Sequence, residues 1–140
     1  IFQLIAKLIG KKLKQIENKN INIEINHENS YFKELIYLFE ETKWYKDPNL
    51  SLNLAAERLN ISSNYLSQII NKIGGVGFVD LLNKYRVEEA AKNLIDPEFS
   101  AYTVTAIGLE SGFNSKSAFY SSFKKFKGVS PAEYRKQNMS

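Results

Sequence analysis

The sequence contains no cysteine, and its only histidine is His27. Thiol catalysis, disulfides and zinc sites built from cysteine and histidine are therefore excluded, because each needs residues that the chain lacks. The absence of cysteine also suits a reducing cytoplasm. No apolar run approaches the roughly 18 to 20 residues that a membrane-crossing helix needs.

Other constellations that carry catalysis are missing as well. There is no glycine-rich phosphate loop with its lysine, and no second histidine to complete a metal pair. Glu40 and Glu41, like Glu88 and Glu89, are adjacent in sequence, so the members of each pair point in different directions on a helix. Neither pair forms a catalytic dyad. We expect no enzyme, no cofactor and no metal.

The composition is that of a folded chain with a mild positive charge. Apolar residues make up 44% of the 140 residues, enough for a core in one domain or in two very small ones. The formal charge of +4 and the pI near 9.2 fit a nucleic-acid partner but also many ordinary enzymes. The chain begins at Ile1 rather than at methionine, and we expect it to be part of a longer protein.

The first 29 residues are predicted to be a helix and a linker. Residues 1–17 place Phe2, Ile5, Ile9, Leu13 and Ile16 at helical spacing, with lysines between them. Three interpretations fit: a helix that packs on the domain, a dimerisation helix, or a juxtamembrane remnant. In residues 18–29 Ile21, Ile23 and Ile25 alternate with a period of two, and we interpret this segment as an extended linker, open to pairing with a second chain.

Residues 30–75 are predicted to contain a scaffold helix and a first helix pair. The scaffold helix, residues 30–45, ends at Asp47-Pro48 because the residue before proline is pushed out of the helical region. In the pair, Ser51 and Ser62 are the expected N-caps. The buried stripes are Leu52, Ala55, Ala56 and Leu59, then Leu66, Ile69, Ile70 and Ile73. The opposite face of the second helix carries Asn64, Ser67, Gln68 and Asn71, either a solvated surface or one that reads base edges.

A glycine break at residues 74–77 precedes one long helix, residues 78–96, which would act as a spacer. The closing unit, residues 103–135, repeats the pair. Val104, Ile107 and Leu109 are expected to pack inward, Gly112 to allow a sharp turn, and Phe113 to anchor it. The last helix divides into a core face of Phe119, Phe123 and Phe126 and an opposite arc of Lys116, Ser117, Tyr120, Ser121, Lys124 and Lys127. Lysines among hydroxyl groups on a helix after a turn favour contact with phosphates and bases.

The closing unit resembles the DNA-binding domain of the AraC/XylS family of transcription regulators. The positions that match the family pattern are Ile107, Gly112, Phe113, Ser117, Phe119, Phe123, Lys124, Gly128, Pro131, Tyr134 and Arg135. The similarity extends back to Leu50 through KYRVEEAAKNL, with Arg86 and Ala90, and LNLAAERLNISSNYLSQII. Two departures stand out: Gly108 replaces the usual alanine, which would cost its helix about 1 kcal/mol and loosen the unit, and the first reading helix lacks arginine.

The resemblance implies an all-α fold of two helix-turn-helix subdomains joined by a long linker helix, here preceded by an extra N-terminal helical segment. Both reading helices would enter successive major-groove segments, roughly 34 Å apart. The resemblance places base contacts on Ser63, Asn64, Ser67 and Gln68, and on Lys116, Ser117, Tyr120 and Ser121. Lys72, Lys124 and Lys127 are the expected phosphate contacts, because a point charge positions the protein without reading sequence.

We therefore interpret the chain as a sequence-specific DNA-binding regulator lacking its sensor domain. Its organisation is expected to be residues 1–29 as the N-terminal segment and 30–140 as the DNA-binding domain, with subdivisions at 30–75, 78–96 and 103–135. The alternative is a helical interaction module that has lost DNA binding. Expected partners are double-stranded DNA, a second copy through the N-terminal segment, and RNA polymerase. We expect a cytoplasmic location, and the segment before Leu50 also resembles the lead-in of membrane-anchored regulators.

Overall fold

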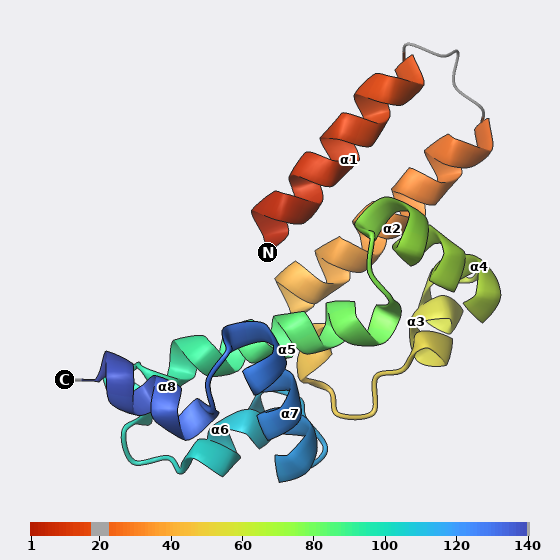
Figure 1. The fold of residues 1–140 in the computed structure, drawn as a ribbon. Helices are drawn as coiled ribbons and strands as arrows, with labels where there is room; N and C mark the ends of the chain where they lie inside the picture. The colour runs from red at the N-terminus through yellow and green to blue at the C-terminus, as the bar shows by residue number, and fades with distance from the viewer. Residues whose placement is uncertain (18–22, 140) are drawn as a thin grey trace. The chain divides into compact units, whose positions relative to one another are not determined.

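Helices account for the regular structure of residues 1–17 and 23–139, the part of the chain that the computed structural model describes (Figure 1). Over these described residues there is no strand, so the expected all-α fold class is confirmed. The α-helices are α1 (Phe2–Glu17), α2 (Ile23–Thr42), α3 (Leu52–Leu59), α4 (Ser63–Ile69), α5 (Phe78–Leu94), α6 (Val104–Glu110), α7 (Lys116–Lys127) and α8 (Pro131–Asn138). Shorter turns are η1 (Trp44–Lys46), the π-helical η2 (Ile70–Gly74) and η3 (Pro97–Phe99).

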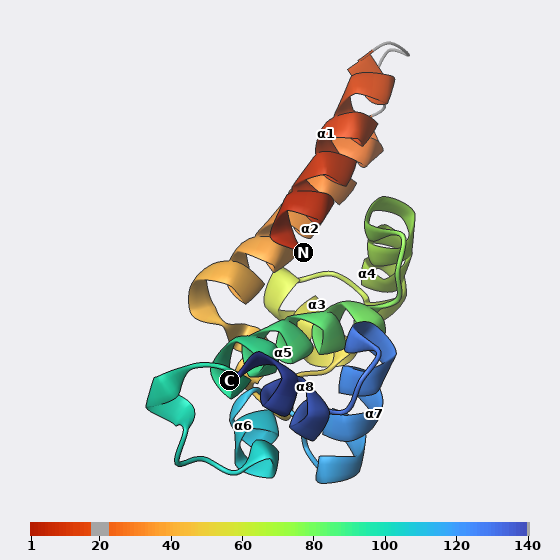
Figure 2. The same cartoon turned by 60° about the vertical axis from the view of Figure 1, so that its left-hand side comes forward.

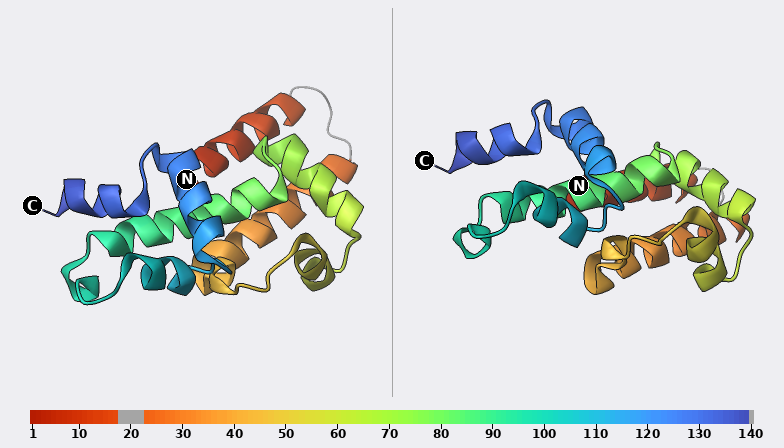
Figure 3. Two further views of the ribbon diagram at one scale, coloured as in Figure 1. Left: turned by 60° about the horizontal axis from the view of Figure 1, so that its bottom comes forward. Right: turned by 90° about the horizontal axis from the view of Figure 1, so that it is seen from below.

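The chain divides into two units that interleave in sequence. Unit 1 comprises Ile1–Trp44 and Leu50–Leu81, and unit 2 comprises Tyr45–Asn49 and Leu82–Ser140. Each unit holds one pair of short helices, α3 with α4 and α6 with α7. The helix α5, seen as one continuous element in Figure 3, contributes residues to both units, as the predicted linker helix should.

The core of unit 1 lies where α2 meets the first helix pair. The side chains with almost no exposed surface are Phe32, Leu35, Phe39, Ala55, Ala56, Leu66, Ile69 and Ile70. The two small alanines let α3 approach its neighbours closely, as the sequence predicted. Gly75 then ends η2 in the left-handed conformation, with φ of +71°, which glycine adopts without strain.

The core of unit 2 is built from α5, α6 and α7 and is rich in phenylalanine. Its buried residues are Val87, Ala90, Ala91, Leu94, Ile107, Phe113, Phe119 and Phe123. The rings of Phe119 and Phe123 meet edge to face with centroids 5.8 Å apart, the arrangement that aromatic quadrupoles favour. Phe126, expected in the core, is only half-buried against it.

The predicted extended linker is wrong for residues 23–29, which form the first turns of α2. Extending an existing helix adds one hydrogen bond per residue without a new nucleus, and this outweighs a three-residue alternation. Ile21 lies outside the described residues. The other end of α2 also differs: the helix stops at Thr42 because Lys43 is left-handed, with φ of +53°, and η1 follows before Asp47-Pro48.

Several smaller predictions in the helix faces and ends are corrected. Leu109 is 45% exposed, because the buried positions of α6 recur at Ile107, Gly108 and Ser111, and Leu109 lies about 200° from Ile107. The helix α5 ends at Leu94 rather than at residue 96, since the Asp96 side chain accepts from Glu98 N and begins η3. At the edges of their helices, Leu52 and Val104 are half-buried and Phe2 is exposed.

Candidate nucleic-acid interface

In the first helix-turn-helix, serine caps fix where the two helices, α3 and α4, begin. The Ser51 hydroxyl accepts from Leu54 N at 3.2 Å, and the Ser62 hydroxyl accepts from Tyr65 N at 3.1 Å. Between the two helices Asn60 takes the left-handed conformation, with φ of +60°, which closes α3 and redirects the chain. Both serine caps are those that the sequence predicted.

The outer face of α4 carries the residues predicted to read bases. Asn64 and Gln68 are exposed, whereas Ser63 and Ser67 are half-buried. The Ser63 hydroxyl donates to Asn53 Oδ1 of α3 at 2.6 Å, which ties the start of α4 to the preceding helix. Asn64 and Gln68 are consequently the members of this set most open to a ligand, and each offers both donors and an acceptor.

Lys72, a predicted phosphate contact, lies in η2 just beyond α4. Its ammonium group forms an ion pair with Glu28 of α2, at 3.0 Å between Nζ and Oε2. The lysine side chain is half-exposed, so the pair is screened by solvent and holds the ammonium weakly. A phosphate at this place would compete with the Glu28 carboxylate.

The second helix-turn-helix has a turn that only glycine fits. Gly112, two residues after the end of α6, has φ of +114°, and a Cβ there would lie 2.3 Å from Tyr45 O and 2.7 Å from Arg86 Nε. Thr103 and Ser115 cap α6 and α7 by accepting from Ala106 N and Ala118 N. Phe113, buried in the core, anchors the turn as expected.

Gly108 lets α6 pack directly on the ring of Phe119. A Cβ on this glycine would lie 2.2 Å from Cδ2 of the ring, far inside van der Waals contact. Phe119 is itself fully buried and has little space to move. Close packing against Phe119 therefore explains why glycine stands at this position. The same packing counteracts the loosening of the unit that helix propensity alone predicts.

Residues 45–49, between α2 and α3 in sequence, are held inside unit 2 by Arg86 of α5. The guanidinium donates from Nε to Tyr45 O at 2.7 Å and from Nη2 to Asp47 O at 2.8 Å. Burial lowers the pKa of Arg86, and the Asp47 carboxylate partly opposes that shift. Arginine nevertheless stays charged at working pH, so this buried cation depends on the two carbonyls.

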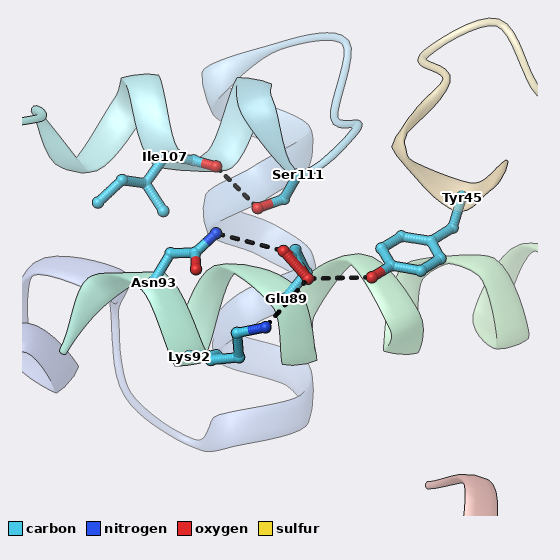
Figure 4. Close-up of polar contacts among 6 residues, drawn as sticks. All are labelled: Tyr45, Glu89, Lys92, Asn93, Ile107 and Ser111. Atoms are coloured by element: carbon cyan, nitrogen blue, oxygen red, sulfur yellow. Dashed lines mark hydrogen bonds and ion pairs between the residues drawn. The ribbon is translucent and has the colours of Figure 1, made fainter. Parts of the chain in front are cut away.

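Glu89, one turn along α5, accepts hydrogen bonds from the same segment and from its own helix (Figure 4). Tyr45 Oη donates to Glu89 Oε1 at 3.1 Å, and Asn93 Nδ2 donates to Oε2 at 3.3 Å. The Tyr45 ring also stacks on Tyr85, with centroids 5.6 Å apart. Since Tyr45 O lies against Gly112, these contacts position the turn that precedes α7.

Sequence reasoning assigned no role to Tyr45, considered Glu89 only as half of a rejected catalytic pair, and used Arg86 only as part of the linker match. One signal was available. Arg86 lies four residues from Leu82 and from Ala90, on the apolar stripe of α5, and all three are buried. A charged residue on a buried helix face needs partners, and here they come from a distant segment.

The predicted reading face of α7 is open to solvent. Lys116, Ser117 and Ser121 are exposed, and Tyr120 is half-buried. The Lys116 ammonium lies 5.3 Å from the centroid of the Tyr120 ring, a cation–π contact along the face. Tyr120 in turn meets Phe119 edge to face at 5.6 Å, so the core below orients the face above.

The lysines at the end of α7 differ in their surroundings. Lys127 forms an ion pair with Glu88 of α5 at 2.8 Å and is only 24% exposed. Lys124 is exposed, and among the described residues it has no carboxylate partner. Both lie in the last turn of α7, where a cation also interacts favourably with the helix dipole. Lys124 is thus the predicted phosphate contact that is most accessible.

Arg135, another residue of the family pattern, holds α8 to the loop before α6. It donates from Nη1 to Tyr102 O at 2.8 Å and from Nη2 to Phe99 O at 2.7 Å. Its role in the structure is therefore architectural. Within residues 1–17 and 23–139 we find no group of three acidic or histidine side chains placed to hold a metal ion. Over the same residues no helix has the length and apolarity needed to cross a membrane.

Two helix-turn-helix pairs with exposed polar second helices, linked through one long helix, define the class of two-motif DNA-binding domains. A helix-turn-helix domain family matches residues 55–137. The chain belongs to this family, in its AraC-type branch.

The chain is similar to several regulators. An uncharacterized HTH-type transcriptional regulator of Staphylococcus aureus is 36% identical over 87 residues, which are 62% of this chain and 11% of that protein. The C-terminal domain of AraT, a response regulator from Geobacillus stearothermophilus, superposes with a TM-score of 0.68 at 33% identity, covering 79% of this chain and 86% of that one. The DNA-binding domain of AdpA, a global transcriptional factor solved with a target DNA, shares the fold with a TM-score of 0.66 at 24% identity, covering 75% and 89%. The match thus spans about a tenth of the length of the staphylococcal regulator.

Proposed function

We propose that this chain is the DNA-reading part of a transcription regulator and that α4 and α7 enter successive segments of the major groove. The observation that supports this most strongly is that the second helix of each helix-turn-helix, α4 in unit 1 and α7 in unit 2, is capped and has an exposed polar face. The chain that carries these helices is of the AraC type. Base reading is assigned to Ser63, Asn64, Ser67, Gln68, Lys116, Ser117, Tyr120 and Ser121.

Phosphate contact is assigned to Lys72, Lys124 and Lys127, with unit 2 supplying the larger share. The face of α4 is almost uncharged and would contribute hydrogen bonds to base edges. For Lys72 and Lys127, DNA must displace the carboxylates of Glu28 and Glu88, which limits what each lysine gains. Neutralising Lys116, Lys124 and Lys127 should therefore flatten the salt dependence of binding more than neutralising Lys72.

The test is a titration against a duplex from the native promoter and against a scrambled duplex, at several salt concentrations. Each base-reading side chain contributes about 1–3 kcal/mol, so Lys116→Ala with Ser117→Ala should weaken specific binding by about tenfold or more. Lys136→Ala, an exposed lysine of α8 outside both predicted faces, is the matched control and should change affinity little.

Equal affinity for the two duplexes would contradict sequence-specific binding. An affinity that does not change with salt concentration would contradict the proposed phosphate contacts. Either result, combined with retained binding to a protein partner, would favour a helical interaction module that has lost DNA binding. The location and the remaining partners belong to the same proposal. We assign the chain to the cytoplasm, with RNA polymerase and a second copy as partners and a membrane anchor in the full-length protein, on the sequence resemblance described above. Fractionation of the full-length protein tests the anchor.

A further inference from the structure

An open apolar groove runs between α1 and α2 in unit 1. The two helices lie side by side and run in opposite directions (Figures 1 and 2). The groove has a volume of about 540 Å³ and is lined by Phe2, Ile5, Ala6, Ile9 and Gly10 of α1 and by Lys33, Ile36, Tyr37, Glu40 and Glu41 of α2. On both helices the lining recurs at positions i, i+3, i+4, i+7 and i+8, the stripe with which a helix packs against further helices.

The apolar side chains divide into a buried floor and an open rim. Ile5, Ile9 and Ile36 are buried and form the floor. Phe2 and Tyr37, at the rim, are 51% and 61% exposed, and neighbouring Leu4 is 55% exposed. Large apolar side chains gathered in this way on a soluble surface are typical of an interaction site.

The charges on the two helices are of opposite sign. Residues 2–12 of α1 carry three lysines, Lys7, Lys11 and Lys12, and no carboxylate. Residues 27–42 of α2 carry four glutamates, Glu28, Glu34, Glu40 and Glu41, against the single Lys33. A surface with a basic helix beside an acidic helix is complementary to itself after a two-fold rotation.

We propose that this groove docks a second copy of the chain, with α1 of each copy against α2 of the other. The two-fold arrangement covers the exposed rim of both copies and pairs their lysines with their glutamates. It specifies the homodimer named under the proposed function and gives α1 a role outside the helix-turn-helix pairs. Dimerisation does not depend on DNA binding, so the two can fail separately. A dimer would carry two DNA-reading domains and bind paired sites more tightly than single ones.

The first test is the mass of the chain in solution over a range of concentrations, by sedimentation or light scattering without DNA. The chain should shift from monomer to dimer, and Phe2→Ser with Tyr37→Ser should raise the dissociation constant by about tenfold or more. Val79→Ser, which removes an apolar side chain that is 65% exposed and does not line the groove, should leave it unchanged. Because the two rim residues are exposed, the thermal melt of the monomer should also stay unchanged.

A charge exchange separates contacts between copies from contacts within one copy. One variant reverses α1 (Lys7→Glu, Lys11→Glu) and another reverses α2 (Glu34→Lys, Glu41→Lys); all four side chains are exposed. Each variant alone should remain monomeric, because its α1 and α2 repel across the interface. Mixed together they should form a one-to-one heterodimer, since only pairing between the two chains restores opposite charges.

A wild-type chain that stays monomeric, or variants that fail to pair on mixing, would overturn the proposal. So would flotation of a monomeric chain on anionic vesicles through the lysines of α1, which would assign that helix to a membrane surface. Binding of a single-site duplex should be the same for wild type and the Phe2 and Tyr37 variant. If the wild-type chain did not bind this duplex, the result would contradict the proposed function but not the proposed dimer.

Discussion

Gly108→Ala is the substitution whose outcome depends most directly on the packing of the second helix-turn-helix. Helix propensity predicts a gain, because alanine is favoured over glycine inside a helix by about 1 kcal/mol. Packing predicts a loss, because the new methyl group would lie 2.2 Å from Cδ2 of the buried Phe119 ring. Favourable contacts between carbon atoms are about 3.5–4.0 Å apart.

The packing effect should be the larger one. Overfilling a well-packed core costs about 1–3 kcal/mol, against the propensity gain of about 1 kcal/mol, so the net loss is on the order of 1 kcal/mol. For a chain of this size that loss lowers the melting temperature by about 3 °C. Moving the ring would also disturb Tyr120, which contacts it on the predicted reading face, so DNA affinity should fall with stability.

The assay is urea unfolding followed by circular dichroism, at a concentration where the chain is monomeric because Gly10 lines the proposed dimer groove, with Gly10→Ala as the matched control. Gly10 is also inside a helix, but a Cβ there would meet nothing within 4 Å, so this variant should gain up to about 1 kcal/mol. Shortening the ring by Phe119→Leu in the Gly108→Ala background should recover part of the lost free energy of unfolding. If Gly108→Ala stabilised the chain as Gly10→Ala does, the packing argument would be refuted.

Three further substitutions test separate contacts. Arg86→Met leaves the carbonyls of Tyr45 and Asp47 unpaired and should cost about 3 kcal/mol, measured by chemical unfolding; Lys92→Met, on an exposed position of the same helix, should cost little. Ser115→Ala removes the cap of α7 and should lower the free energy of unfolding by about 1 kcal/mol. Glu88→Gln frees Lys127, so DNA affinity should rise and its salt dependence steepen; an unchanged salt slope would mean that Lys127 does not contact phosphate.

Local signals in the sequence predicted the elements and most of their ends. The caps at Ser51 and Ser62 were predicted because a serine hydroxyl satisfies an amide only three residues away, and the structure has caps of the same kind at Thr103 and Ser115. The sequence did not predict the first turns of α2, because residues 23–29 lack a regular apolar stripe of their own. They are helical as an extension of the amphipathic helix that follows them. Leu109 was misplaced because apolar character was counted without its angle around the helix.

The sequence predicted the exposed polar faces of the candidate site, but it did not predict the contacts between distant residues that hold these helices in place. Exposed polar residues such as Asn64, Gln68 and Ser117 follow from helical periodicity once the buried stripe is known. The segment held by Arg86 was not predictable, because it belongs by sequence to the first helix pair and in space to the second unit. The ion pair of Lys72 with Glu28 likewise joins residues 44 positions apart, and no local sequence pattern predicts it.

The measurement that tests the central claim most directly is selection of binding sites from a pool of duplexes with a randomised central segment. If α4 and α7 each read bases in successive major-groove segments, the selected duplexes will share two short conserved blocks with centres about 10 base pairs apart. The Lys116→Ala, Ser117→Ala variant should then lose one block and keep the other. A wild-type pool that enriches no common sequence would contradict the account.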